Sequence, residues 1–467
     1  MSFLIVLAAL AFLMFVAYRG HSVILFAPIA AMGAVLLTDP SLVAPMFTGL
    51  FMDKMVGFLK LYFPVFLLGA IFGKVIELSG FSKAIVAATI KVVGAKRAML
   101  SIVLVCALLT YGGVSLFVVV FAVYPFAAEL FRQGDIPKRL IPGTIALGAF
   151  TFTMDALPGT PQIQNIIPTA FFGTDAWAAP WLGLIGGVFI LAVGIAYLDW
   201  RRRVAMRNGE GYAGDAELVN EPAPFLGGRL ANPLVAIAPL LVVGIANKLL
   251  TSGIPRWYGD SHSFVPGVVG DAAPVVQEVS RIAAIWAVEG ALLLGIATVL
   301  LFAFRPVMAG FAEGSRTAIG GALLAGMNTT SEYGFGAVIA ALPGFLVVAD
   351  ALASIPNPLV NEAVTVTALA GITGSASGGM GIALAAMADT FIANAQAAGI
   401  PLEVFHRVAA MASGGMDTLP HNGAVITLLA VTGLTHRQAY KDIFAITIIK
   451  TVAVFVVIGV FYATGIV

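Results

Sequence analysis

Charged side chains are scarce in this chain, and cysteine is nearly missing. Only 10% of the 467 residues are Asp, Glu, Lys or Arg, and Cys106 is the single cysteine. A lone cysteine excludes an internal disulfide and a cysteine-rich metal site, and a net charge of +1 offers no electrostatic footprint for nucleic acid. We therefore expect no cofactor and no nucleic-acid partner, and we interpret Cys106 as a buried packing residue.

Long apolar runs take the place of charge. Hydrophobic residues make up 60% of the chain, and the mean hydropathy is +1.00, which is typical of membrane proteins rather than soluble ones. Runs long enough to cross a bilayer lie, for example, at residues 56–78, 178–200, 277–303 and 440–464. Because helices satisfy their own backbone in lipid, this pattern predicts an all-α polytopic membrane protein. Residues 2–17 lack the preceding basic residues of a leader peptide, so we interpret them as a retained first helix.

The sequence contains an internal duplication. Three short segments return about 263 positions later: 72–76 (FGKVI) as 335–339 (FGAVI), 135–137 (DIP) as 399–401 (GIP), and 154–158 (MDALP) as 416–420 (MDTLP). Matches at nearly one offset indicate two repeats. We place them at residues 1–200 and 231–467, with a linker at residues 201–230.

Charge placement predicts that the two repeats are inverted. Basic residues near helix ends favour the cytoplasm, so the Arg-rich run at 201–207 places the linker inside. In the first repeat, Arg19 and the Lys/Arg cluster at 83–97 lie inside and Asp39 lies outside; in the second repeat, the acidic loop at 251–276 reverses that order. Inverted repeats are the plan of many secondary transporters, whose site lies near the membrane midplane, although channels can share it.

Each repeat contains a segment that we predict to be a re-entrant hairpin. Residues 98–131 begin and end beside basic clusters, so two legs of about 15 residues, each too short to cross, would meet at a tip. That tip carries Gly112, Gly113 and Ser115. The matching hairpin spans residues 361–397, and its candidate substrate-binding residues are Thr373, Ser375, Ser377 and Gly378. Hydroxyls and bare N–H groups can bind an anion, whereas the alternative is that Gly and Ser only allow close helix packing.

Each repeat also contains a helix that we predict to unwind within the membrane. The first unwound segment carries Asp155 and Thr160, and its mate carries Asp417, His421 and Asn422. Thr160, His421 and Asn422 are candidate substrate-binding residues, and Asp155, Asp417 and His421 are candidate proton-coupling groups. A charge at this depth costs at least about 2.5 kcal/mol and usually marks a pathway or relay, although Asp can also cap a broken half-helix. His421, the one histidine expected at depth, titrates near neutral pH. We therefore predict that the Asp417 and His421 side carries the coupling proton.

The sequence also predicts positions for three further polar residues, Glu332, Arg407 and His406. Glu332 follows the polar run at 328–331, and it is predicted either to line the cavity as a proton-coupling group or to lie at a scaffold interface. The predicted topology puts Arg407 near the outer face, where a basic residue is unusual. His406, like His21, His262 and His436, is expected in a loop or near a helix end.

These motifs make the chain resemble a known transporter family. The two hairpin tips, the Gly-rich element at 332–336 and the neighbouring His421 and Asn422 are similar to motifs of the gluconate permease (GntP-type) family of the ion transporter superfamily, over essentially the whole length. The resemblance implies proton-coupled uptake of sugar acids or short hydroxy-carboxylates. The leg at 114–117 is closer to 3-hydroxybutyrate permeases.

The sequence thus predicts a proton symporter for a small hydroxy-carboxylate such as 3-hydroxybutyrate or gluconate, and not an enzyme. We expect about ten transmembrane helices plus two re-entrant hairpins, with each half supplying scaffold helices and a mobile transport unit, in the bacterial inner membrane as a homodimer. Sodium coupling is the main alternative, because carbonyls and hydroxyls at unwound tips also suit a hard cation. A membrane-embedded hydrolase using Asp155 and Asp417 as a catalytic pair, and a passive anion channel, are the others.

Overall fold

The computed structural model describes residues 2–19, 21–93, 97–114, 116–214, 218–222, 230–265, 274–345, 347, 355–420 and 422–467. Two predicted site residues, Ser115 and His421, lie outside the described residues. The described part is helical almost throughout, and its one sheet pairs β1 (Ser261–Phe264) antiparallel with β2 (Val275–Glu278). The predicted all-α class is confirmed.

The helices follow one another with short connections. The first part of the chain forms α1 (Ser2–Tyr18), α2 (Val23–Thr38), η1 (Pro40–Leu42), α3 (Val43–Pro45), η2 (Met46–Phe51), α4 (Met52–Leu78), α5 (Phe81–Val93), α6 (Ala98–Tyr111), α7 (Leu116–Gln133), η4 (Lys138–Leu140), α8 (Ile141–Ala149), α9 (Phe152–Asp155), α10 (Ile163–Phe172) and α11 (Pro180–Arg207). The second part forms α12 (Pro233–Tyr258), α13 (Val279–Ala341), α15 (Pro358–Thr373), α16 (Ala376–Ala398), α17 (Leu402–Ser413), α18 (Gly423–Thr432) and α19 (His436–Thr464). Among the described helices, six are long and apolar enough to cross a membrane, and several shorter apolar ones accompany them.

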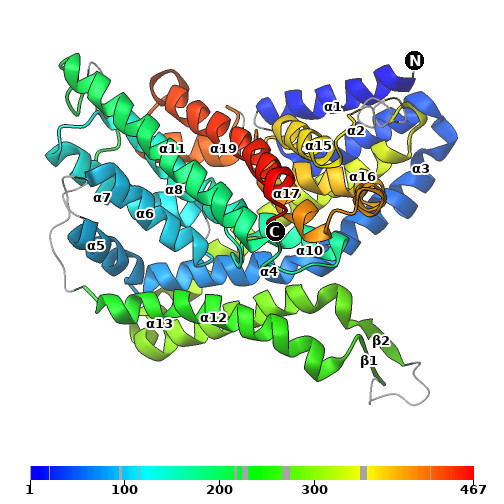
Figure 1. The fold of residues 1–467 in the computed structure, drawn as a ribbon, viewed down its shortest axis with the longest axis horizontal. Helices are drawn as coiled ribbons and strands as arrows, with labels where there is room; N and C mark the ends of the chain where they lie inside the picture. Colours follow the sequence, from blue (N-terminus) through cyan, green and yellow to red (C-terminus); the bar gives the residue numbers. More distant parts are fainter. Residues whose placement is uncertain are drawn as a thin grey trace.

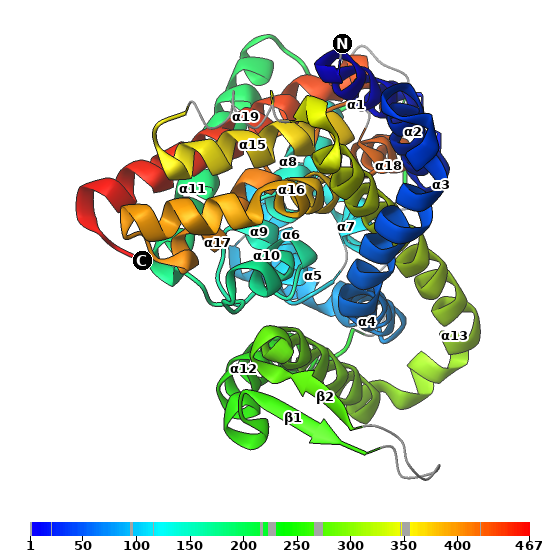
Figure 2. The ribbon, with the colours of Figure 1, turned by 90° about the vertical axis from the view of Figure 1, so that its right-hand side faces the viewer.

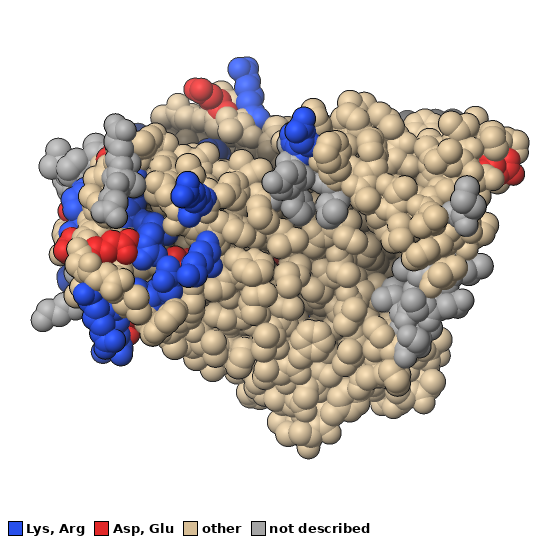
Figure 3. Space-filling view, turned by 90° about the horizontal axis from the view of Figure 1, so that it is seen from above, with Lys and Arg blue, Asp and Glu red and all other residues tan. Residues whose placement is uncertain are grey.

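The surface carries its charge at one end. Figure 3 shows Lys and Arg gathered at the end where α7 and α11 finish in Figure 1, whereas most of the remaining surface in that view is uncharged. Large apolar side chains are exposed between the ends, among them Leu249 at 67% and Leu301 at 78%. An apolar belt beside a basic end is what a multi-pass helical protein presents to lipid and to the cytoplasm.

The helices separate into two groups when the molecule is seen along its long axis (Figure 2). Helices α1 to α4 with α12 and α13 curve around one side, and α12 with the start of α13 and the two strands forms a lobe of its own. We call this group the scaffold helices, after the predicted scaffold. Helices α6 to α11, α15 to α17 and α19 lie on the other side. Together with α18, which packs against α7 and α8, we call them the transport unit, after the predicted mobile part. Helix α13 passes between the lobe and the main body, with a kink at Ala303, three residues before Pro306. Proline removes a backbone donor and clashes with the preceding turn, which accounts for the kink.

Helices α11 and α19, which the repeat matches to each other, run antiparallel. Arg201 near the end of α11 forms an ion pair of 2.6 Å with Asp442 near the start of α19. Gly186 near the start of α11 instead faces Val457 near the end of α19. This opposite direction is what an inverted repeat requires, while the repeat boundaries at residues 200 and 231 stay a prediction. Helix α11 itself continues to Arg207, into the predicted linker.

The described part of the linker docks on the basic end of the molecule. Two bonds of 2.6 and 2.7 Å join the guanidinium of Arg139 to the carboxylate of Glu210. The ammonium of Lys138 donates to the carbonyl of Val219 at 2.6 Å and pairs with Glu221 at 2.7 Å. The linker therefore holds the starts of η4 and α8 in place.

Candidate functional site

The first hairpin ends on a helix break. Helices α6 and α7 form its legs, and the polypeptide turns at Gly113, whose φ of +96° favours glycine. The first break, residues 150–162 between α8 and α10, contains only the single turn α9. Its Gln162 donates from the side-chain amide to the carbonyls of Thr110 at 2.7 Å and Val114 at 3.3 Å, and the hydroxyl of Tyr111 donates to Pro158 at 2.8 Å. The tip is thus tied to the first break.

The second hairpin repeats this arrangement. Helices α15 and α16 form its legs, and Gly374 turns the chain at a φ of +67°. The second break, residues 414–422, separates α17 from α18. Its Asn422 donates to the carbonyl of Gly374 at 2.6 Å, and its side-chain oxygen accepts from the N–H groups of Ala424 and Val425 at the start of α18.

Gln162 and Asn422 occupy matching positions. Each precedes a ten-residue half-helix, and the two half-helices end at the left-handed glycines Gly173 and Gly433. Sequence reasoning selected Asn422 and missed Gln162. The matching terminal glycines are the signal that aligns the two amides.

Most of the predicted hydroxyls at the second tip already bind protein groups. Ser375 accepts from the N–H of Gly378 at 3.1 Å and so caps α16, while the hydroxyl of Thr373 donates to the carbonyl of Leu369 at 3.0 Å. Ser377 shares a hydrogen bond of 3.0 Å with Thr329 of α13.

Thr160, in the first break, differs from these hydroxyls. Its side-chain oxygen is buried without a hydrogen-bond partner in the described part of the chain. At the first tip, Gly112 approaches Leu240 of α12 so closely that a Cβ would collide with that side chain. Among the predicted hydroxyls that the structure describes, Thr160 is thus the one without a protein partner, whereas Gly112 is a packing position.

The two predicted aspartates come together where the breaks cross. Asp155 is 1% exposed, and neither of its carboxylate oxygens has a hydrogen-bond partner among the residues described. It faces Gly414 of the second break so closely that a Cβ there would collide with the carboxylate. Asp417 is instead held by Lys450 of α19 at 2.5 Å, and Lys450 also donates to the carbonyl of Phe150 in the first break.

Arg407 and His406 are buried between the breaks. The prediction that Arg407 lies near the outer face stays a prediction, and the structure adds that the side chain is fully buried, at 0% exposure. Its guanidinium donates to the carbonyl of Asp155 at 3.1 Å, to Asn165 at 2.9 Å and to the carbonyl of Ala178 at 2.7 Å. Unwound backbone leaves carbonyls without helical donors, and Arg supplies several donors at once.

His406 lies in the second turn of α17 (Leu402–Ser413), near a helix end as expected. It is buried within α17, where its ring nitrogens lie 3.3 Å from Asn165 and 2.6 Å from the hydroxyl of Thr174. Both ring nitrogens of His406 therefore have partners, one in α10 and one in the loop that follows α10.

The charges of this site balance. Lys450, Asp417 and Arg407 all lie within electrostatic reach of Asp155. Two acids and two bases give a net charge of zero when all are ionised, and one proton on Asp155 gives a net charge of +1. We call these four residues the charged quartet. Protonation of Asp155, whose carboxylate is the unpaired one of the quartet, would make the charged quartet complementary to a monoanion.

Glu332 lies elsewhere, at the interface between α13 and the second hairpin. It is 2% exposed, and its carboxylate lies directly against Gly378 in the first turn of α16. This contact with a residue of the predicted second tip is compatible with both predicted places, so the role of Glu332 stays a prediction. A further buried carboxylate, Glu362 of α15, has no hydrogen-bond partner for either oxygen within the described ranges, and sequence reasoning missed it.

Comparison with known proteins identifies relatives of this fold and sequence. No family model matches the chain. The chain is 61% identical over 476 residues to the uncharacterized transporter YxjC of Bacillus subtilis (strain 168), and the match covers 100% of both. Its fold is similar to the crystal structure of the Alcanivorax borkumensis YdaH transporter, described as having an unusual topology, with a TM-score of 0.51 and 13% identity over 89% of this chain and 88% of that one. At this identity the second likeness concerns the fold alone.

Proposed function

Because the chain belongs to the same transporter family as YxjC, we propose that it is a secondary active transporter whose substrate site lies where the hairpin tips meet the two helix breaks. The observation that carries the proposal is the repeated tether. Gln162 and Asn422 each join a helix break to the hairpin tip of their own half, next to the charged quartet. Irregular backbone inside a membrane protein is tolerated where it lines a cavity or a site.

The substrate we propose is a small hydroxy-carboxylate, such as 3-hydroxybutyrate or gluconate. The N-termini of α10 and α18 begin at the breaks, and α16 begins at the second tip. Helix N-termini carry partial positive charge and favour anions. The free hydroxyl of Thr160 adds a hydrogen-bonding group for a substrate oxygen.

Coupling is proposed to use a proton carried by Asp155. The sequence favoured the Asp417 and His421 side, but Asp417 is held in an ion pair with Lys450, whereas Asp155 is unpaired in the described structure. A buried carboxylate without a partner is neutral at lower cost than ionised. The same pairing of Asp417 weakens the hydrolase alternative, because a catalytic pair of aspartates needs both carboxyl groups free.

Sodium coupling is the second candidate. Its support is a group of buried oxygens near the second tip without partners among the described residues, namely those of Asn328, Ser331 and Glu332. Carbonyl, hydroxyl and carboxylate oxygens are the ligands that hard cations prefer.

The test is transport by the purified protein in proteoliposomes. Radiolabelled 3-hydroxybutyrate and gluconate are supplied outside, in sodium-free buffer, with the outside more acidic by one pH unit. We expect accumulation above the outside concentration, and none in vesicles without protein. Accumulation only in the presence of sodium would show that sodium, and not a proton, is the coupling ion. Uptake that never exceeds equilibrium would indicate a channel, and no uptake of either acid would reject the proposed substrate class.

The proposal includes the bacterial inner membrane as location and a homodimer as the working form. The apolar side chains exposed on α12 and α13 can face either lipid or a second copy. Cross-linking in native membranes separates a dimer from a monomer.

A further inference from the structure

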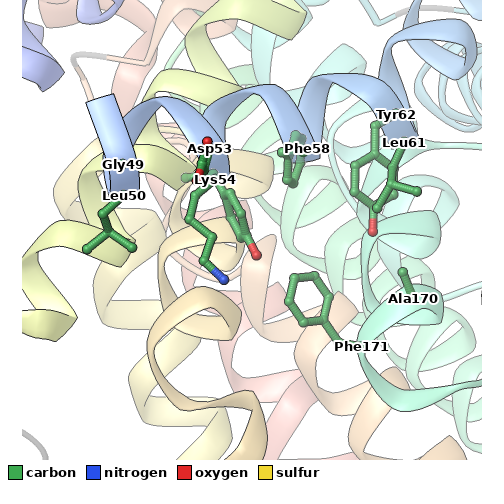
Figure 4. A pocket seen from close by; sticks show the side chains of 11 residues that line it. Gly49, Leu50, Asp53, Lys54, Phe58, Leu61, Tyr62, Ala170 and Phe171 are labelled. Carbon is green, nitrogen blue, oxygen red and sulfur yellow. The ribbon is translucent and has the colours of Figure 1, made fainter. Parts of the chain in front are cut away.

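A cavity of about 480 Å³ lies between the scaffold helices and the transport unit. Helices η2 and α4 provide most of its wall, Tyr333 of α13 closes one side, and Ala170 and Phe171 of α10 close the other. Figure 4 shows Lys54 reaching from α4 into this space, toward Phe171. The volume falls within the range of about 300–1,000 Å³ that is typical of small-molecule pockets.

The cavity offers one cation beside aromatic rings. The exposed ammonium of Lys54 forms no ion pair with another described residue. The rings of Phe58 and Tyr333 lie 4.9 Å apart, and those of Phe171 and Tyr333 lie 6.2 Å apart. Asp53 also lines the space, beside Lys54 in sequence. With one carboxylate and one ammonium the lining carries no net charge, so an anion with an organic body would pair with Lys54 itself and pack against the rings.

Helix α10 connects the wall of the cavity to the proposed substrate site. At the deep side of the cavity the hydroxyl of Tyr62, which is 1% exposed, donates to the carbonyl of Ile167 at 2.9 Å and so joins α4 to α10. Helix α10 continues from there back to Gln162 and the first break. Because α4 begins at the end of the molecule away from the basic cluster, the cavity lies toward the outer face.

We propose that this cavity is a second, outer binding site for the transported carboxylate. The carboxylate pairs with Lys54, and Phe58, Phe171 and Tyr333 cover the organic part before the substrate moves past Tyr62. This inference rests on the proposed function. The shared chemistry, one anionic group on an apolar body, also describes an anionic lipid, but the volume and the position between the two groups of helices favour the substrate.

The first test compares Lys54→Gln with Lys60→Gln, which removes a second exposed lysine of α4 that does not line the cavity. Uptake of radiolabelled 3-hydroxybutyrate is measured in right-side-out membrane vesicles. We expect Lys54→Gln to raise KM for uptake about tenfold, the loss of about 1.4 kcal/mol of binding, with an unchanged maximal rate, while Lys60→Gln and Lys54→Arg keep the wild-type KM. The KM for efflux should stay unchanged. If Lys54→Gln transports like Lys60→Gln, the inference is wrong.

The second test replaces the charge chemically. Cys106 is buried, so in Lys54→Cys the new thiol is the exposed one among the described residues. A cationic methanethiosulfonate should restore the low KM, an anionic one should raise KM further, and 3-hydroxybutyrate should slow both reactions. Labelling that 3-hydroxybutyrate does not slow would overturn the inference.

A third arm separates substrate from lipid. If the cavity holds a lipid, vesicles made without phosphatidylglycerol should reproduce the KM of Lys54→Gln in the wild type, and that result would also overturn the inference. An unchanged wild-type KM supports it. Failure of the proposed function itself would look different, because the wild type would then take up no carboxylate at all.

Discussion

Asp155→Asn is the sharpest test of coupling, because the structure gives one unpaired carboxylate in the charged quartet. One such group supplies one proton for each substrate molecule. For a monoanion carried with one proton, transport is electroneutral, and a gradient of one pH unit is worth about 1.4 kcal/mol, which sustains about tenfold accumulation. Asparagine keeps the size of the side chain and resembles its neutral form. The variant should therefore still bind and exchange substrate, with an accumulation ratio of about one.

The assay measures both quantities in the same proteoliposomes. Exchange is followed as uptake of labelled substrate into vesicles preloaded with unlabelled substrate, without a pH gradient, and accumulation is followed with a gradient of one unit. Glu362→Gln is the matched control, since it also neutralises a buried carboxylate without a described partner, but on α15. We expect tenfold accumulation in the control. If Asp155→Asn accumulates substrate like the wild type, or if Glu362→Gln loses accumulation instead, the reasoning about Asp155 is refuted.

Three further predictions concern the frame of the site. Asp417→Asn or Lys450→Met should each destabilise the protein by about 3–5 kcal/mol, because each leaves a buried charge alone. The melting temperature in detergent should fall for each and recover partly in the double variant, and additive losses would show that the pair is not coupled. Gln162→Ala and Asn422→Ala each remove the tether to a hairpin tip, worth about 1 kcal/mol, so the KM for substrate should rise about fivefold. The control Gln164→Ala, in the half-helix α10 that follows Gln162, should leave KM unchanged. Equal KM values in all three variants would contradict the proposed tethers. The guanidinium of Arg139 holds the pKa of Glu210 below its usual value, so this contact stabilises the fold above the ordinary Glu pKa of about 4.3 and is lost as the pH falls through the lower, folded value. Glu210→Gln should thus lower the melting temperature at pH 7 and have a smaller effect in strong acid, and an equal drop at both pH values would exclude a role for the charge.

The hairpins and breaks could be predicted because their signals are local. Gly112 and Gly113 interrupt one apolar stretch, and Pro158 interrupts another. Such residues favour a turn or an end of a helix wherever they occur. The structure has a turn or a break at each of these points. Which of the residues there bind substrate stays a prediction.

The partners inside the site could not be predicted in the same way. Lys450 lies in the run at 440–464, which reads as one apolar helix, and its pairing with Asp417 depends on how α19 packs against the second break. Arg407 was placed by the predicted topology and His406 by its position along the chain, and neither carries information about which helices pack against these side chains. A lysine in the middle of an apolar run was nevertheless a usable signal, because such a residue needs a partner.

The charged quartet also bears on how the two halves have diverged. At the repeat offset of about 263 positions, Lys450 corresponds to Gly187 and Arg407 corresponds to Thr144. In the predicted repeats, each half thus has its own acid, Asp155 or Asp417, while both bases come from the second half alone. An ancestor assembled from two identical copies of the first half would have had both acids and neither base. The two copies are no longer interchangeable. Reconstructed ancestral sequences would show the order in which Lys450 and Arg407 arose.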